Sequence, residues 1–145
     1  MDDIDLYLRM LEMSKQGFQC AQIPVILALE SEGKENGDLL RAAGGLNNGL
    51  ADTSGPCGAL LGCCCLISYF AGKGDADELE DPALSDMISE FANWFREEYG
   101  KLYGGHICSE ILNGDPGNKL ARCPGIVKAS FLKAMEILGN AGTNA

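Results

Sequence analysis

Apolar residues recur along most of this chain at the three- and four-residue spacing of amphipathic helices, and no stretch alternates residue by residue as a half-buried strand does. The spacing predicts a first helix over residues 5–15, a second that starts near Cys20 and crosses the apolar run 23–29, and a short third helix over residues 38–43. Pro82 opens a long helix with an aromatic stripe on one side and charges on the other. The pattern therefore predicts an all-α protein.

The most apolar stretch, over about residues 58–72, carries apolar side chains or thiols on every face. It is shorter than the roughly 20 residues that a membrane-spanning helix needs, so we expect it to be buried in protein. A chain of 145 residues can bury about 70% of its unfolded surface within one domain. We predict a single-domain bundle over residues 1–145, with about five or six helices around this central one and a loose tail from about residue 139.

Two further segments matter for the site. Residues 106–112 predict a short helical turn, and Cys123 is expected to cap the last helix, with Pro124 at its first position after a polar link over 117–122. The glycine-rich stretch 44–49 either brings the backbone close to a neighbouring helix or bound group, or forms a flexible turn.

The formal net charge of −10 and the lack of a basic stripe argue against nucleic acid and against anionic membranes as partners. An acidic surface suits a basic partner protein, but it is also an ordinary means of solubility. The single histidine leaves no credible Ser-His-Asp or Cys-His-Asn set. The acidic segment 1–5 differs from a secretory signal, so we expect a reducing, cytoplasmic compartment and no membrane insertion.

Four of the seven cysteines, Cys20, Cys57, Cys108 and Cys123, each stand at the start of a predicted helix. Unpaired backbone N–H groups and the helix dipole favour a thiolate at such an end. If the four ends converge, they offer four sulfur ligands to a metal ion or an iron–sulfur cluster. The odd number of cysteines rules out a fully paired set of disulfides within one chain and leaves open a site shared between two chains.

The cysteine spacing by itself leaves three hypotheses, because no CxxC pair is present. The first is an iron–sulfur centre for electron transfer, such as a 2Fe–2S cluster. The second is thiol–disulfide chemistry with Cys57 as a low-pKa attacking thiol and another of the four as its resolving partner. The third is a structural zinc or interaction domain without redox activity, whose first candidate surface is the aromatic helix near Trp94. Cys63, Cys64 and Cys65 are expected to act as small buried hydrophobes, and His106 either tunes a nearby ligand or is an ordinary polar residue.

The residues Gly17–Gln22, Cys57–Gly62, Cys108–Leu112 and Cys123 resemble the CGAxxG four-cysteine family of redox-active proteins, C_GCAxxG_C_C, over about residues 13–138. Similar sequence accompanies haem motifs in split-Soret-type cytochromes, where an iron–sulfur cluster is implied, but this chain has no CxxCH haem motif. The resemblance implies an oxidoreductase or electron carrier that holds a cluster or a dithiol at Cys20, Cys57, Cys108 and Cys123 and exchanges electrons with a partner protein.

Overall fold

The computed structural model describes residues 1–143 and contains seven α-helices and no strand in that part of the chain. The all-α prediction is confirmed, and the six helices that accompany the central one in this part of the chain agree with the five or six expected. The elements are α1 (Asp3–Lys15), α2 (Ile23–Ser31), α3 (Gly37–Ala43), η1 (Gly44–Leu46), α4 (Gly58–Ala71), α5 (Leu84–Tyr103), α6 (Cys108–Leu112), η2 (Pro116–Asn118) and α7 (Lys119–Asn140).

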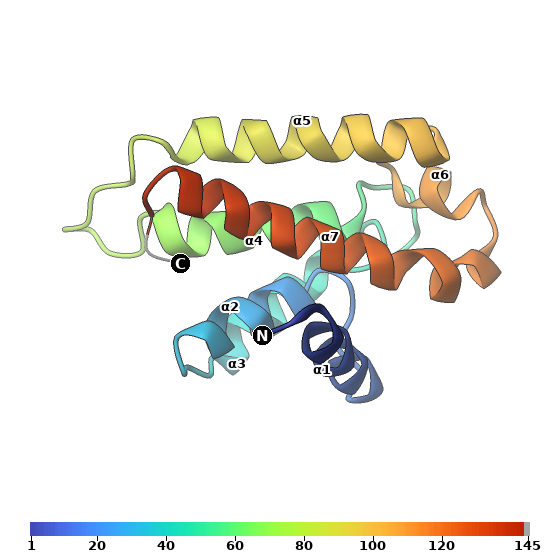
Figure 1. Cartoon of the computed structure of the whole chain (residues 1–145), viewed down its shortest axis with the longest axis horizontal. Coiled ribbons are helices and arrows are strands. Elements are labelled where there is room, and N and C mark those ends of the chain that lie inside the picture. Colours follow the sequence, from blue (N-terminus) through green and yellow to red (C-terminus); the bar gives the residue numbers. More distant parts are fainter. Residues whose placement is uncertain (144–145) are drawn as a thin grey trace.

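The helix α4 lies at the centre of the bundle, as its apolar sequence predicts. It packs against α2, α5 and α7, and several of its side chains, including Ala59, Leu66 and Ile67, are completely buried. A helix that is apolar on all faces is stable in water only when neighbours cover all of them. Figure 1 shows α5 and α7 alongside α4, with α1, α2 and α3 on the other side.

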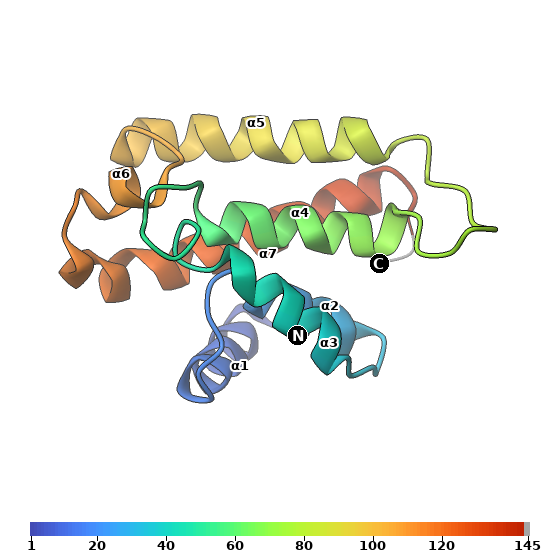
Figure 2. The ribbon, with the colours of Figure 1, turned by 180° about the vertical axis from the view of Figure 1, so that it is seen from behind.

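The directions of the long helices determine which helix ends lie together at one end of the bundle. In Figures 1 and 2, α4 and α7 run the same way and α5 runs in the opposite direction. The N-terminal ends of α4 and α7 therefore lie at the same end of the bundle as the C-terminal end of α5 and the short helix α6. Three of the four cysteines belong to segments at this end.

The segment before α2 lies directly on α4, with no side chain between the two backbones. A Cβ atom on Gly62 would stand 2.5 Å from the carbonyl oxygen of Ala21 and 2.8 Å from its Cα. A side chain at position 62 cannot fit there without moving the backbone, so Gly62 permits this close approach. It places the Cys20–Ala21 segment against the first turns of α4.

The helix α2 begins at Ile23, so the prediction that it starts near Cys20 or Ala21 is two to three residues too early. Residues 20–22 form a turn instead, in which the N–H of Ala21 donates to the Asn47 side-chain oxygen at 2.9 Å. This long-range bond holds the turn against the 47–55 loop. Cys20 therefore precedes the helix and does not sit in its first turn.

The start of α7 also differs from the prediction. The helix begins at Lys119, so the expected link over 117–122 is largely helical, and Cys123 lies within the helix rather than capping it. Pro124 is an interior residue of α7. Because proline has no N–H, it cannot donate the helical hydrogen bond to the carbonyl of Leu120. Leu120 is 87% exposed, so water can donate to this carbonyl instead.

The C-terminal end of α7 lies slightly later in the chain than expected. The helix continues to Asn140, so the expected tail starts at residue 141 rather than 139, and residues 144–145 lie outside the described part. Within residues 1–143, no helix combines the length and the apolar character that crossing a membrane demands.

Candidate functional site

The four cysteines singled out by the sequence come together around one small cavity of about 20 Å³. Cys20, Cys57, Cys108 and Cys123 all line it, and they come from four separate segments of the chain. The described chain contains no disulfide, since all seven cysteines are free thiols. The fold thus gathers four thiols that lie up to about a hundred positions apart in the sequence.

Two of the cysteines are held by a short backbone pairing. Cys57 is the N-cap of α4, as predicted, and its N–H donates to the carbonyl oxygen of His106 at 2.8 Å. Cys108 is the first residue of α6, and its N–H donates to the carbonyl oxygen of Gly55 at 2.9 Å. These two bonds join the entries to α4 and α6, so the positions of both thiols depend on each other.

A loop with a left-handed backbone covers the site. Ala51 N–H donates to the carbonyl of Asn47 at 2.9 Å, which closes one left-handed turn. Such a backbone costs about 1–2 kcal/mol for each residue other than glycine, so the surrounding contacts have to hold it. The residues with positive φ are Asn48 (56°), Gly49 (59°), Leu50 (61°), Ala51 (78°) and Thr53 (67°).

This left-handed turn rests directly on two of the cysteines. The N–H of Asn48 donates to the sulfur of Cys20 at 3.5 Å. A Cβ on Gly49 would stand 2.5 Å from the Cβ of Cys108. Of the two interpretations of the glycine-rich stretch, close approach of the backbone is therefore the one observed, and the approached group is a cysteine.

Gly58 leaves room for the sulfur of Cys20. A Cβ built on Gly58 would overlap that sulfur, because Gly58 is the first residue of α4 and faces the 20–22 turn. Gly58 and Gly62 lie one turn apart on the same helix face. Together they form the glycine face on which the Cys20–Ala21 segment lies.

Burial controls the acidity of the thiols. It raises the pKa of Cys57 to about 12 and that of Cys123 to about 11, and it also raises the pKa of Cys108. The backbone N–H groups of Ala59 and Leu60 at the start of α4 lower the pKa of Cys57, but they do not outweigh desolvation of a residue that is only 7% exposed. The expectation that Cys57 ionises readily at its helix end is therefore wrong.

The four thiols share a cavity but do not surround a single point. Within residues 1–143, no three side chains of His, Cys, Asp or Glu are arranged to hold a metal ion. The cavity has room for about one water molecule. The donor set suits a thiolate-bound metal centre, but the observed side-chain positions would have to move apart to admit one.

The three consecutive cysteines of α4 lie away from the cavity. Cys63 is completely buried in the main core, Cys64 packs at its edge, and Cys65 packs on the separate cluster around Val25. These positions agree with their interpretation as small hydrophobes. His106 contributes its backbone carbonyl to Cys57, and its side chain does not line the cavity.

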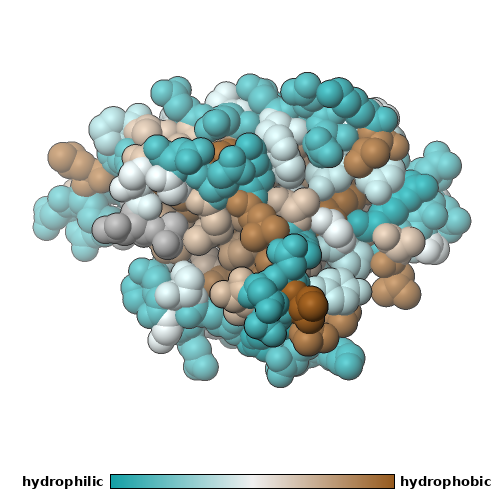
Figure 3. All heavy atoms as spheres, in the orientation of Figure 1, coloured by the Kyte–Doolittle hydropathy of each residue, from teal (hydrophilic) through white to brown (hydrophobic). Residues whose placement is uncertain are grey.

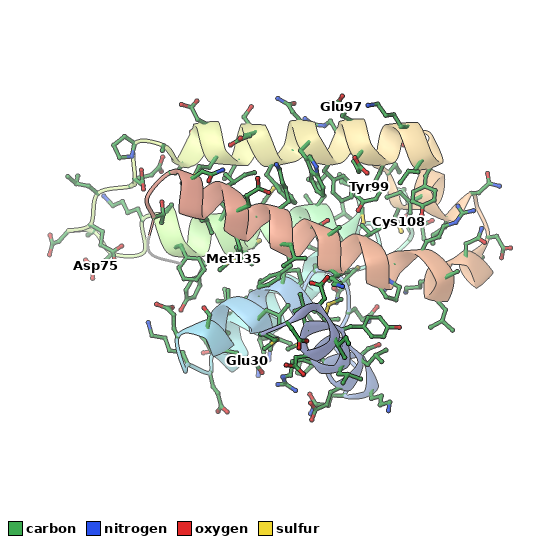
Figure 4. The ribbon with its side chains drawn as sticks, viewed as in Figure 1. Glu30, Asp75, Glu97, Tyr99, Cys108 and Met135 are labelled. Atoms are coloured by element: carbon green, nitrogen blue, oxygen red, sulfur yellow. The ribbon has the colours of Figure 1, made fainter. Side chains whose placement is uncertain are left out.

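Three residues near the thiols had no signal in the sequence. Asn48 and Lys119 line the cavity, and their side chains are hydrogen-bonded to each other. Tyr99 is buried beside the thiols: its pKa rises to about 12, mainly through burial and then through Glu98 and Cys57. Figure 4 shows Tyr99 and Cys108 at the same end of the bundle, with Glu97 on the outer face of α5. Only long-range packing brings these residues to the site.

The comparisons with known proteins agree with this gathering of cysteines. The family described as "Putative redox-active protein (C_GCAxxG_C_C)" matches residues 18–137, which include all four of them. No curated protein and no solved structure gave a significant match. The family motif reads Gly-Cys-Ala-x-x-Gly, whereas this chain reads Cys57-Gly58-Ala59-Leu60-Leu61-Gly62, so cysteine and glycine have exchanged places at its start. Because the match covers most of the chain, the protein belongs to this four-cysteine family, whose members are described as redox-active.

Proposed function

We propose that Cys20, Cys57, Cys108 and Cys123 hold an iron–sulfur cluster and that the protein carries electrons. One observation carries this proposal: four sulfur atoms from four separate segments line the same cavity. Four cysteine thiolates are the usual ligand set of such clusters, which supply the protein with a centre that accepts and releases single electrons. No oxygen or nitrogen ligand is needed from the rest of the chain.

The acidity of the thiols supports a metal centre over a free dithiol. Thiols whose pKa values are raised to about 11 or 12 stay protonated at neutral pH and attack disulfides slowly. Neighbouring thiols raise these pKa values further, since thiolates in one small cavity repel each other. A bound cation reverses this balance, because a coordinating thiol loses its proton outright.

Backbone donors at the site would suit a negatively charged cluster. Asn48 N–H donates to the sulfur of Cys20, and the N–H groups of Ala59 and Leu60 at the start of α4 lower the pKa of Cys57. Hydrogen bonds to cluster sulfurs stabilise the reduced, more negative state and raise the reduction potential. These donors belong to the left-handed turn and to the start of α4, so the two elements would tune the same centre.

The arrangement of the thiols favours a cluster over a single zinc ion, although the cavity would have to widen for either. A tetrahedral zinc site needs its ligands to converge on one point, and no such convergence is present in residues 1–143. A cluster contains several iron and sulfide atoms, so its cysteine ligands stand further apart. The closely spaced cysteine pairs of structural zinc sites are also absent from the sequence.

A dithiol function is the second candidate, and one observation favours it. Cys20 and Cys123 also line a larger, open groove, so an external molecule in that groove can reach both thiols. In this alternative the two thiols form one disulfide and release two electrons and two protons to a disulfide substrate, which is reduced to two thiols. The attacking thiol would then be Cys20 or Cys123, not the buried Cys57.

In the cluster proposal the electrons pass to or from a partner protein. A reducing compartment such as the cytoplasm would keep the four cavity thiols available for the cluster. The acidic chain, with its net charge of −10, would favour a partner with a basic surface.

The deciding experiment is purification without oxygen, followed by an absorption spectrum and assays of iron, zinc and sulfide on the same sample. The cluster proposal expects absorption between about 320 and 460 nm with iron and sulfide present. Cys57→Ser should remove this absorption, whereas the control Cys65→Ser should keep it, because Cys65 does not line the cavity. A colourless protein with neither iron nor zinc would favour the dithiol candidate, and zinc without iron would favour a structural site.

A further inference from the structure

A groove of about 600 Å³ lies between α1, the turn before α2 and the start of α7. Its volume falls within the range of small-molecule binding sites, about 300–1,000 Å³. The walls are mostly apolar and include Met10 and Leu11 of α1, Phe18 of the connecting segment, and Leu120 and Val127 of α7. The groove is thus large enough, and apolar enough, to take most of a small organic molecule.

The groove adjoins the cysteine cavity. Four residues line both spaces and form the wall between them: Cys20, Lys119, Cys123 and Val127. Cys57 and Cys108 line only the cavity. A molecule in the groove would therefore contact two of the four thiols and not touch the other two.

Lys119 gives the groove its charge. It is the single charged side chain among the lining residues, although the whole chain has a net charge of −10. Its ammonium group donates to the neutral side-chain oxygen of Asn48, and within residues 1–143 it forms no ion pair with a carboxylate. The ammonium group is therefore available to one anionic group of a ligand.

The rim of the groove carries exposed apolar side chains. Tyr7 of α1 and Leu120 of α7 both line the groove, and both are exposed. Figure 3 shows apolar side chains gathered over α1 and where it faces α7, on a surface that is otherwise largely hydrophilic. Apolar surface around a groove is typical of a ligand-binding site.

We propose that this groove binds a small amphiphilic monoanion, with its apolar body along α1 and Phe18 and its anionic head at Lys119. The combination of a single cation with apolar walls selects this class over polyanions, which the acidic chain repels, and over sugars, which need many polar partners. The bound molecule covers the thiols of Cys20 and Cys123. This inference goes beyond the proposed electron transfer and does not depend on it, because Cys20 and Cys123 are the only proposed cluster ligands among the residues that line the groove.

Calorimetric titration with octanoate and with 1-octanol tests the proposal, because the two share an apolar chain and differ in charge. We expect both to bind the wild-type protein, octanoate more tightly. Lys119→Met should lower the affinity for octanoate by roughly threefold to fivefold, the effect of losing an exposed ion pair, and leave the affinity for octanol unchanged. Lys101→Met on α5 is the matched control, since Lys101 is exposed and lines no part of the groove. Leu11→Trp, which places a larger side chain in the groove, should weaken binding of both.

Thiol alkylation read by mass spectrometry gives a second measurement. Octanoate should slow the alkylation of Cys20 and Cys123 and leave that of Cys65 unchanged, since Cys65 faces another part of the protein. The proposal is overturned if octanoate fails to bind, if Leu11→Trp leaves binding intact, or if all thiols are protected equally. It is also overturned if sedimentation shows a dimer that Leu11→Trp dissociates, because a second copy of the chain would then occupy the groove.

Discussion

Gly62 provides the sharpest test of how the central helix supports the site. A methyl group at this position would stand 2.5 Å from the carbonyl oxygen of Ala21, 2.8 Å from its Cα and 3.0 Å from its carbonyl carbon. All three are backbone atoms, so no side-chain rotation can relieve the contact. Gly62→Ala must push the Cys20–Ala21 segment away from α4.

The size of the effect follows from two opposing terms. Replacing glycine by alanine inside a helix gains about 1 kcal/mol in helix propensity. Overpacking a close-packed interface costs about 1–3 kcal/mol, and the upper end applies here because only backbone can yield. We therefore expect Gly62→Ala to lower the free energy of unfolding by about 2 kcal/mol. In a domain of this size the melting temperature should fall by roughly 4–8 °C.

Guanidinium denaturation under reducing conditions, followed by far-ultraviolet circular dichroism, measures this change. Gly100→Ala is the matched control, because Gly100 lies inside α5 with no atom within 4 Å of its would-be Cβ. The control should be more stable than wild type by up to about 1 kcal/mol. If Gly62→Ala were as stable as Gly100→Ala, the claimed backbone contact between α4 and Ala21 would be refuted.

Three other predictions concern the thiols directly. Gly58→Ala should displace the sulfur of Cys20 and speed its alkylation, as read by mass spectrometry, while Gly100→Ala leaves that rate unchanged. The free energy of unfolding should fall as pH rises between about 9 and 12. The folded state raises the pKa of Cys57 from 9.0 to about 12 and that of Tyr99 from 10.0 to about 12, so the unfolded chain loses these protons first. Denaturant titrations that give the same free energy of unfolding across this pH range would contradict this. Cys63→Ser should lower the free energy of unfolding by about 1–3 kcal/mol, as measured by denaturation, because it buries a hydroxyl without a partner. The same change should leave any visible absorption unaltered.

The sequence by itself determined the features that depend on neighbouring residues. Helical periodicity gave the all-α class, and the unbroken apolar stretch gave the central helix over nearly its observed length, Gly58–Ala71. The position of Cys57 at the N-cap also followed from the local Gly-Pro-Cys-Gly run. The same local reasoning failed at Pro124, which was expected to be the first residue of the last helix. The exposed carbonyl of Leu120, one turn earlier, can bond to water, so the helix can begin at Lys119.

The tertiary structure alone decided how the cysteines meet and how acidic they are. Convergence of Cys20 with Cys57 depends on the glycine face of α4, and the cover over them depends on a left-handed turn that includes Leu50 and Ala51, residues that local preference would not place there. The pKa of Cys57 was misjudged because a helix end favours the thiolate while burial opposes it, and burial is a property of the whole fold. Contacts between distant segments carry no periodic signal along the chain. The sequence could therefore indicate which four of the seven cysteines to consider, but not the surroundings of their thiols.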